Sequence, residues 1–189
     1  MWKYWLATHV GVGKLRMYSR NYALRKLRSD IEMFFARSEY EADYLRRGYG
    51  IEDKKIAIIP LSYRGDHHDD TIEKEPFCLF TGTMTQPRKN VPRLIDAAKK
   101  YGFTLKLVGN KGNVQSEAKL RERIGDAKNI EIIGFVSDEE LISLYDRAKV
   151  FALPSLNEGV GLVALEAASH CCNIVITKFG GPKEYYEIG

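Results

Sequence analysis

Residues 154–166 read PSLNEGVGLVALE, and they decide the fold because they contain the turn that leads from a strand into a helix. Just upstream, AKVFAL (148–153) is an apolar run of strand length that Pro154 and Ser155 bring to an end. From Gly161 onward, GLVALEAAS consists largely of good helix formers and contains no proline, so we expect a helix to begin near Gly161.

The turn and the new helix also have the chemistry of an anion-binding site. The first amide groups of a helix have no partner inside it, and they attract phosphate. Glu158 lies in the turn, and Glu166 lies about 7–8 Å further along the helix axis than Gly161, a span similar to that from a diphosphate to its ribose hydroxyls. Glu166 is the only charge in an otherwise apolar helix, so a polar group should meet it. A nucleotide, a backbone cap or a lysine could each be that group.

Strand and helix patterns alternate regularly from Phe77 to the end of the chain. The predicted strands are residues 77–82, 104–109, 129–134, 150–153 and 173–178, and the helices between them are residues 92–101, 116–125, 138–147 and the one from residue 161. Five strands separated by helices predict an α/β fold with a doubly wound parallel sheet. Three of these strands end in glycine, and ligands of such folds bind at the carboxyl ends of the strands.

A basic pair follows the first of these strand ends. After Gly82 the chain continues as TMTQPRKN, which places Arg88 and Lys89 ahead of the next helix. Two cations near a helix start favour a polyanion, because hydrogen bonds to charged groups are stronger than neutral ones. A solvated surface pair is the alternative interpretation.

The first third of the chain predicts a smaller β-α-β unit. MFFARS (33–38) and KIAIIP (55–60) have strand character, and a helical stretch between them ends at glycine. The polar stretch that follows predicts a linker, so we divide the chain into residues 1–62, 63–76 and 77–189. Within the linker, HHDD (67–70) places adjacent polar side chains on a loop, and we expect them to be solvated rather than to bind a metal ion.

Composition indicates a soluble chain with one basic end. Of its residues, 44% are apolar, and the three cysteines form an odd set without metal-ligand spacing, which predicts a reducing, cytoplasmic setting. Residues 1–28 contain seven Lys or Arg and no acid, mixed with aromatic residues. This segment suits peripheral contact with an anionic membrane, and a helix with a solvated basic face is the alternative. We expect no nucleic-acid partner.

Four ordered blocks together resemble a known family. They are GTMTQPRKNVPRLIDAA (82–98), LKLVGN (105–110), the long block from residue 129 to residue 169, and VITKFGGPKEY (175–185). Residues 77–187 resemble the C-terminal, nucleotide-sugar-binding domain of GT-B glycosyltransferases, specifically the retaining family 4. Residues 31–60 resemble the end of that family's N-terminal domain. The resemblance therefore implies a Rossmann-like GT-B C-terminal domain, incomplete at both ends, with a remnant of the acceptor-side domain.

The resemblance also implies roles for individual residues. Glu158 would contact the donor sugar at the reacting centre as the catalytic residue, and Glu166 would bind the nucleotide ribose. The other implied donor-binding residues are Gly82, Arg88, Lys89, Asn110, Phe135, Val136, Val160, Gly161 and Leu162. Backbone at Phe135 and Val136 would contact the base, and amides from Val160 to Leu162 would hold the diphosphate. In this sequence Thr83 and Cys171 stand where the family commonly has arginine and glycine, and Arg88 could substitute for that arginine.

The reaction that the resemblance implies is sugar transfer with retention, from a nucleoside-diphosphate sugar such as a UDP- or GDP-sugar, without a metal or cofactor. The acceptor would be a glycan, a lipid or a protein. Since most of the acceptor-side domain has no counterpart here, we expect a fragment or a half-enzyme that needs a partner chain. The alternative is a non-catalytic nucleotide-binding or partner-binding module.

Overall fold

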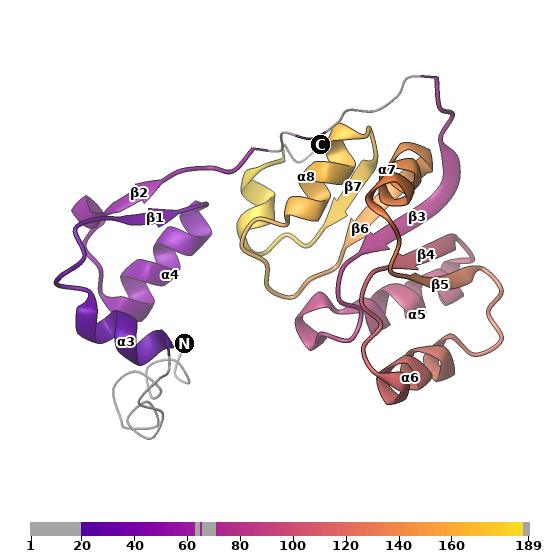
Figure 1. Cartoon of the computed structure of the whole chain (residues 1–189), viewed down its shortest axis with the longest axis horizontal. Helices are drawn as coiled ribbons and strands as arrows, with labels where there is room; N and C mark the ends of the chain where they lie inside the picture. The colour runs from indigo at the N-terminus through magenta and orange to yellow at the C-terminus, as the bar shows by residue number, and fades with distance from the viewer. Residues whose placement is uncertain (1–19, 63–64, 66–70, 187–189) are drawn as a thin grey trace. The chain divides into compact units, whose positions relative to one another are not determined.

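The computed structural model describes residues 20–62, 65 and 71–186, and the chain divides between Leu61 and Ser62 into two compact units (Figure 1). Most of the basic segment 1–28 and the HHDD stretch at 67–70 lie outside the described residues. Across the described ranges, the helices lack the combination of length and apolar character that crossing a bilayer requires.

The first unit contains a small parallel β-α-β arrangement, as the sequence predicts. Its elements are α3 (Arg20–Leu27), β1 (Phe34–Ala36), α4 (Glu39–Tyr49), η1 (Asp53–Lys55) and β2 (Ile56–Ile58). Strands β1 and β2 pair in parallel. Helix α4 begins after Ser38, whose hydroxyl accepts the Glu41 amide at 3.2 Å, and ends at Gly50 in the left-handed conformation. Local capping chemistry therefore sets both ends of this helix.

The second unit is the α/β domain that the alternating pattern predicts. Its strands are β3 (Glu75–Thr81), β4 (Thr104–Val108), β5 (Ile130–Gly134), β6 (Ala148–Leu153) and β7 (Asn173–Ile176). Its helices are α5 (Val91–Tyr101), α6 (Val114–Ile124), α7 (Asp138–Arg147) and α8 (Leu162–Ser169), with short η2 (Pro87–Lys89) and η3 (Gly181–Glu184) turns. All strand pairs are parallel, in the order β5-β4-β3-β6-β7. The doubly wound parallel sheet is confirmed.

The strand order places helices on both faces of the sheet. The chain steps outward from β3 to β5, then returns past β3 to form β6 and β7. With right-handed crossovers, α5 and α6 cover one face and α7 and α8 the other (Figure 1). The strand order reverses beside β3, so the helices that follow β3 and β6 lie on opposite faces while the two loops lie next to each other at the carboxyl edge, where such folds bind ligands.

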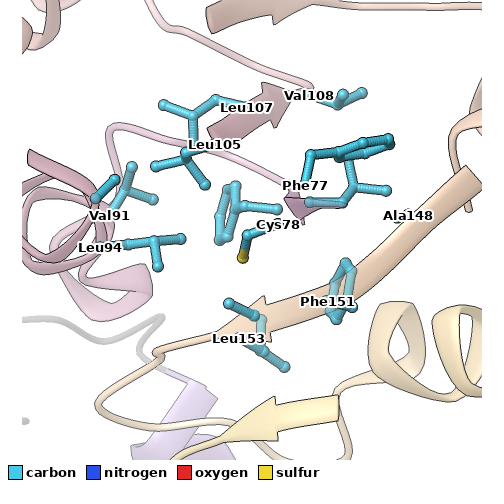
Figure 2. Packing of buried hydrophobic residues seen from close by; sticks show 14 of the residues in the cluster. Phe77, Cys78, Val91, Leu94, Leu105, Leu107, Val108, Ala148, Phe151 and Leu153 are labelled. Carbon is cyan, nitrogen blue, oxygen red and sulfur yellow. The ribbon is translucent and has the colours of Figure 1, made fainter. Parts of the chain in front are cut away.

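The core lies between the central strands and the helices. Leu79, Phe80, Leu105, Leu107 and Phe151 are fully buried. Residues of β3, β4, β6 and α5 interdigitate within this cluster (Figure 2). Burying one such side chain contributes about 1.5–3 kcal/mol, so the central strands form a rigid base for the loops at their ends.

Two elements begin at other residues than the sequence predicts, and a side-chain contact accompanies each observed start. Strand β3 begins at Glu75, two residues before the strand predicted from residue 77, and the Glu75 carboxylate pairs with Arg147 at 3.1 Å. The helix predicted over 116–125 begins at Val114, because the Asn113 side chain caps it by accepting the Ser116 amide at 2.9 Å.

Cys171, where the resembled family commonly has glycine, has a φ of 56° just beyond α8. A left-handed backbone costs a residue with a side chain about 1–2 kcal/mol. Glycine avoids this cost, but it also increases the conformational entropy of the unfolded chain, which offsets part of the stabilisation. We therefore expect Cys171→Gly to stabilise the protein by about 0.5–1 kcal/mol in urea unfolding. Cys171→Ala, which removes the exposed thiol but keeps the β-carbon, is the control and should change little. Equal stabilisation by both variants would contradict the backbone explanation.

Candidate functional site

The candidate site lies at the carboxyl edge of the sheet, where the loop after β3 meets the loop after β6. Backbone groups join the two loops directly: the Leu156 amide donates to the Arg88 carbonyl at 2.7 Å. The Asn90 side-chain amide adds a second link by donating to the Pro154 carbonyl at 3.3 Å. The 154–166 stretch is therefore tied to the basic pair at residues 88 and 89.

Glu158 is the centre of the polar contacts in this region. Its carboxylate accepts hydrogen bonds from Lys89 Nζ at 2.7 Å, from Arg88 Nη1 at 3.2 Å and from the Ser155 hydroxyl at 3.2 Å. The side chains of Lys89 and Glu158 are only 10% and 14% exposed, whereas that of Arg88 is 50% exposed. The interpretation of the basic pair as solvated is thus wrong for Lys89, which is buried against a carboxylate.

The charge state of Glu158 follows from two opposed effects. Burial raises the pKa of its carboxyl group, but the hydrogen bond and charge of Lys89, assisted by Arg88, outweigh burial and hold the pKa below its usual value. Glu158 is therefore ionised at neutral pH. Two cations against one carboxylate leave this cluster with a net positive charge, which favours an anionic ligand.

A third segment, at residues 177–182, supports the Glu158 loop from the other side. The Gly181 amide donates to the Glu158 carbonyl at 3.1 Å, and the Thr177 hydroxyl donates to the Ser155 carbonyl at 2.8 Å. Gly180 has a φ of 100°, and a β-carbon there would lie 2.9 Å from the Glu158 carbonyl oxygen. The sequence contains this segment as VITKFGGPKEY, but its support of Glu158 was not predicted from it.

Gly161 forms the tight entry into α8. Its φ is 75°, and a β-carbon there would lie 2.8 Å from Leu153 Cδ2 and 3.6 Å from Glu158 Cγ. Val160 is buried, whereas Leu162, the first residue of the helix, is 44% exposed. The positive φ and the close approach to the Leu153 side chain both favour glycine at this position, and the start of α8 lies beside Glu158.

Gly82 and Asn110 bind the ends of β3 and β4 to each other. The Gly82 amide donates to the Val108 carbonyl at 3.0 Å, and the Asn110 amide donates to the Gly82 carbonyl at 3.1 Å. A β-carbon on Gly82 would lie 3.9 Å from Lys89 Cε, so Gly82 lies beside the Lys89 side chain. The Asn110 side chain accepts the Gly112 amide at 2.7 Å and thus shapes its own turn.

Glu166 lies half-buried in α8, and its carboxylate meets a tyrosine. Tyr145 Oη lies 3.1 Å from Glu166 Oε2 and also 3.1 Å from Thr81 Oγ1 at the end of β3. The sequence indicated that Glu166 needs a polar partner. In the structure that partner is the Tyr145 hydroxyl and not a lysine. Tyr145 and Ser155 were both missed, since neither stands out in the sequence.

Phe135 and Val136 follow β5 at the same edge of the sheet. The Phe135 side chain is 78% exposed, whereas Val136 is partly buried against the core. The link to the rest of the edge is the Gly109 amide, which donates to the Gly134 carbonyl at 2.7 Å. The loop that carries Phe135 therefore begins beside the end of β4, and the described hydrogen bonds include none between Phe135 and Glu158.

Metal-ligating side chains do not gather within the described ranges: no group of three or more His, Cys, Asp or Glu residues is close enough to hold an ion. The polar groups that the described cluster offers are the cations of Lys89 and Arg88 and the carboxylate of Glu158.

The chain is similar to sugar transferases in sequence and in fold. It is 32% identical over 105 residues to the "Uncharacterized glycosyltransferase MJ1178" of Methanocaldococcus jannaschii, covering 56% of this chain and 29% of that protein. It is 26% identical over 201 residues to a "Probable sucrose-phosphate synthase" of Thermosipho melanesiensis, covering 99% of this chain and 46% of that protein. The chain thus spans less than half the length of these relatives.

The fold is similar to that of the pneumococcal O-GlcNAc transferase GtfA, solved in complex with UDP and GlcNAc. The TM-score is 0.69 at 19% identity, and the match covers 88% of this chain and 34% of the other. The parallel α/β architecture is thus that of Rossmann-like GT-B glycosyltransferases. Residues 66–188 match the family model described as "Glycosyl transferases group 1". With this match spanning most of the chain, the protein belongs to the glycosyl transferases group 1 family.

Proposed function

We propose that residues 77–189 bind a nucleoside-diphosphate sugar and supply the donor side of a retaining, family 4 type glycosyl transfer. The observation that carries the proposal is the Lys89–Glu158–Arg88 cluster beside the start of α8. A diphosphate would meet two cations and unpaired helix-start amides in one place, at the edge of the sheet where ligands of this fold class bind.

Each proposed contact follows from where the residue lies at the carboxyl edge of the sheet or in α8. Amides from Val160 to Leu162 would hold the diphosphate, and Glu166, half-buried in the middle of α8, would accept hydrogen bonds from the ribose hydroxyls. Backbone around Phe135 and Val136 would contact the base. Glu158, held by Lys89 and Ser155, would contact the sugar.

The proposed chemistry rests on electrostatic stabilisation of the leaving group. When the bond between sugar and phosphate breaks, negative charge develops on the departing diphosphate, and fixed cations stabilise it without reorganisation. In the free protein Lys89 and Arg88 donate to Glu158, so an arriving diphosphate competes with that carboxylate for the same donors. Because Glu158 is ionised at neutral pH, it is also available to stabilise positive charge that develops on the sugar.

The acceptor and the setting of the reaction are further parts of this proposal. A glycan, lipid or protein acceptor would be bound largely by an acceptor-side domain, of which residues 1–62 would be a part and a partner chain could supply the rest. We propose a cytoplasmic protein with peripheral contact to an anionic membrane. Co-sedimentation with anionic liposomes, before and after deletion of residues 1–28, tests that contact.

The binding proposal is tested by titration calorimetry. UDP- and GDP-sugars are first screened by thermal stabilisation, and the best donor is then titrated into the wild-type chain. Glu166→Ala should weaken binding by about 1–3 kcal/mol, because it removes a charged hydrogen-bond acceptor from the proposed ribose contact. Glu122→Ala, which removes an exposed carboxylate of α6, is the matched control and should bind the donor normally.

Two results would count against the proposal. Equal donor affinity in wild type and Glu166→Ala would show that Glu166 does not bind the ribose. If no donor binds to wild type, the proposed function is wrong. If the donor is hydrolysed, the anomer of the first sugar released, followed by NMR, tests retention. Tight binding without turnover in the presence of acceptors would favour a non-catalytic module.

A further inference from the structure

The contact between Tyr145 and Glu166 has a defined direction. The Tyr145 hydroxyl carries a single proton, which it donates to Glu166 Oε2, 3.1 Å away. Tyr145 Oη can then only accept from Thr81, so the Thr81 hydroxyl donates across its own 3.1 Å contact. The result is an ordered chain from Thr81 through Tyr145 to Glu166.

The phenol keeps the proton that this chain requires. Burial raises the pKa of Tyr145 well above its ordinary value, and the neighbouring Glu166 carboxylate raises it further, whereas the Thr81 contact acts in the opposite sense. Tyr145 therefore remains a neutral donor across the physiological pH range.

The Tyr145 ring is itself held on several sides. It stacks on His170 with ring centroids 5.7 Å apart and an interplanar angle of 18°, and it packs against Phe151 at 6.0 Å. His170 is fixed in turn by Asp146, at 2.8 Å from its Nδ1. The Tyr145 side chain is only 2% exposed. Its hydroxyl is thus a fixed point, and the flexible glutamate is the group that must adapt to it.

We propose that Tyr145 is a positioning residue for nucleotide binding: its hydroxyl, oriented by Thr81, holds Glu166 Oε2 and leaves the second carboxylate oxygen for the ribose hydroxyls. This inference rests on the proposed function of Glu166. A free glutamate side chain on a helix samples several rotamers, and fixing it before the ligand arrives removes part of the entropic cost of binding.

The test compares nucleotides with and without ribose hydroxyls. UDP and GDP, and their 2′,3′-dideoxy forms, are titrated into wild type and Tyr145→Phe. For the ribonucleotide that wild type binds, Tyr145→Phe should weaken binding by about five- to tenfold, which corresponds to the loss of one hydrogen bond. For the dideoxy form of the same nucleotide, Tyr145→Phe should weaken binding by less than about twofold. Tyr101→Phe, which alters an exposed tyrosine of α5, should leave both affinities unchanged.

A second background tests whether Tyr145 acts through Glu166. In Glu166→Ala, which removes the acceptor of the Tyr145 hydroxyl, the additional Tyr145→Phe change should weaken ribonucleotide binding by no more than about twofold, because residues that act through one contact are not additive. Thr81→Val removes the hydroxyl that orients Tyr145 without changing the tyrosine, and it should weaken ribonucleotide binding by about two- to fivefold. This variant keeps the inference testable if Tyr145→Phe folds poorly.

The possible outcomes separate the two proposals. If wild type binds the ribonucleotide and Tyr145→Phe binds it equally well, this inference is wrong and the proposed function still stands. Equal weakening for the ribose and dideoxy forms would also overturn it, since that result indicates a general structural role. If wild type binds neither UDP nor GDP, the proposed function fails, and this inference fails with it.

Discussion

Gly109→Ala is expected to destabilise the second unit by about 3 kcal/mol or more, because no side chain fits between the ends of β3 and β4. A β-carbon at this position would lie 2.4 Å from the Gly82 carbonyl oxygen and 3.1 Å from both Gly82 C and Gly82 N. The φ of 111° adds backbone strain for any residue with a side chain. Urea unfolding of wild type and variant measures the loss.

Gly102→Ala is the matched control for this experiment. Gly102 also has a positive φ, 72°, but a β-carbon there would meet nothing within 4 Å. The control should therefore lose only about 1–2 kcal/mol, the cost of the left-handed backbone alone. Equal losses in the two variants would contradict the steric explanation. Because Gly82 lies beside Lys89, Gly109→Ala should also weaken donor binding in any folded fraction.

Lys89→Met should have the largest effect at the candidate site, on both stability and binding. Removing the ammonium leaves a largely buried Glu158 with only Arg88 and Ser155 as side-chain partners among its described contacts, and we expect a loss of about 2–3 kcal/mol of folding free energy. Donor affinity should fall by about 10- to 100-fold, since a buried cation that would contact the diphosphate is lost. Urea unfolding and calorimetry measure the two effects separately.

A double variant separates the structural role of Lys89 from its proposed role in binding. Lys89→Met combined with Glu158→Gln removes the unpaired charge, so it should recover more than half of the lost stability. Donor binding should remain weak, because the cation is still absent. Arg88→Ala is the comparison: its side chain is 50% exposed, so its ion pair should contribute less than about 1 kcal/mol to stability. Recovery of donor binding in the double variant would contradict the direct role of Lys89.

Local patterns in the sequence predicted most of the fold. Strand runs such as 104–109, and helices such as 138–147, follow from the apolar period and from residues that stop or cap an element. The structure places these two elements at Thr104–Val108 and Asp138–Arg147. Boundaries shifted by a residue or two where a side chain intervened, as the Asn113 cap did at the start of α6.

The partners of the site residues were less predictable. The sequence indicated that Glu158, Lys89 and Glu166 belong to one region, and it indicated that Glu166 needs a polar partner. It did not indicate that Lys89 is buried against Glu158 at 2.7 Å, 69 positions away, or that Tyr145 meets Glu166. Such pairs depend on which strands are neighbours, and apolar periodicity carries no information about strand order.

The sequence by itself therefore determined the elements, the alternation that makes the sheet parallel, and the glycines and charges at the strand ends. These features depend on interactions between residues close in the chain, namely backbone propensity, capping and the period of burial. The tertiary structure alone decided that the loops after β3 and β6 lie side by side, with Lys89 and Arg88 around Glu158 and with the Tyr145 hydroxyl against Glu166. The physical reason is that burial and charge pairing act through space, so a carboxylate's partners are set only once the strand order β5-β4-β3-β6-β7 has brought distant loops together.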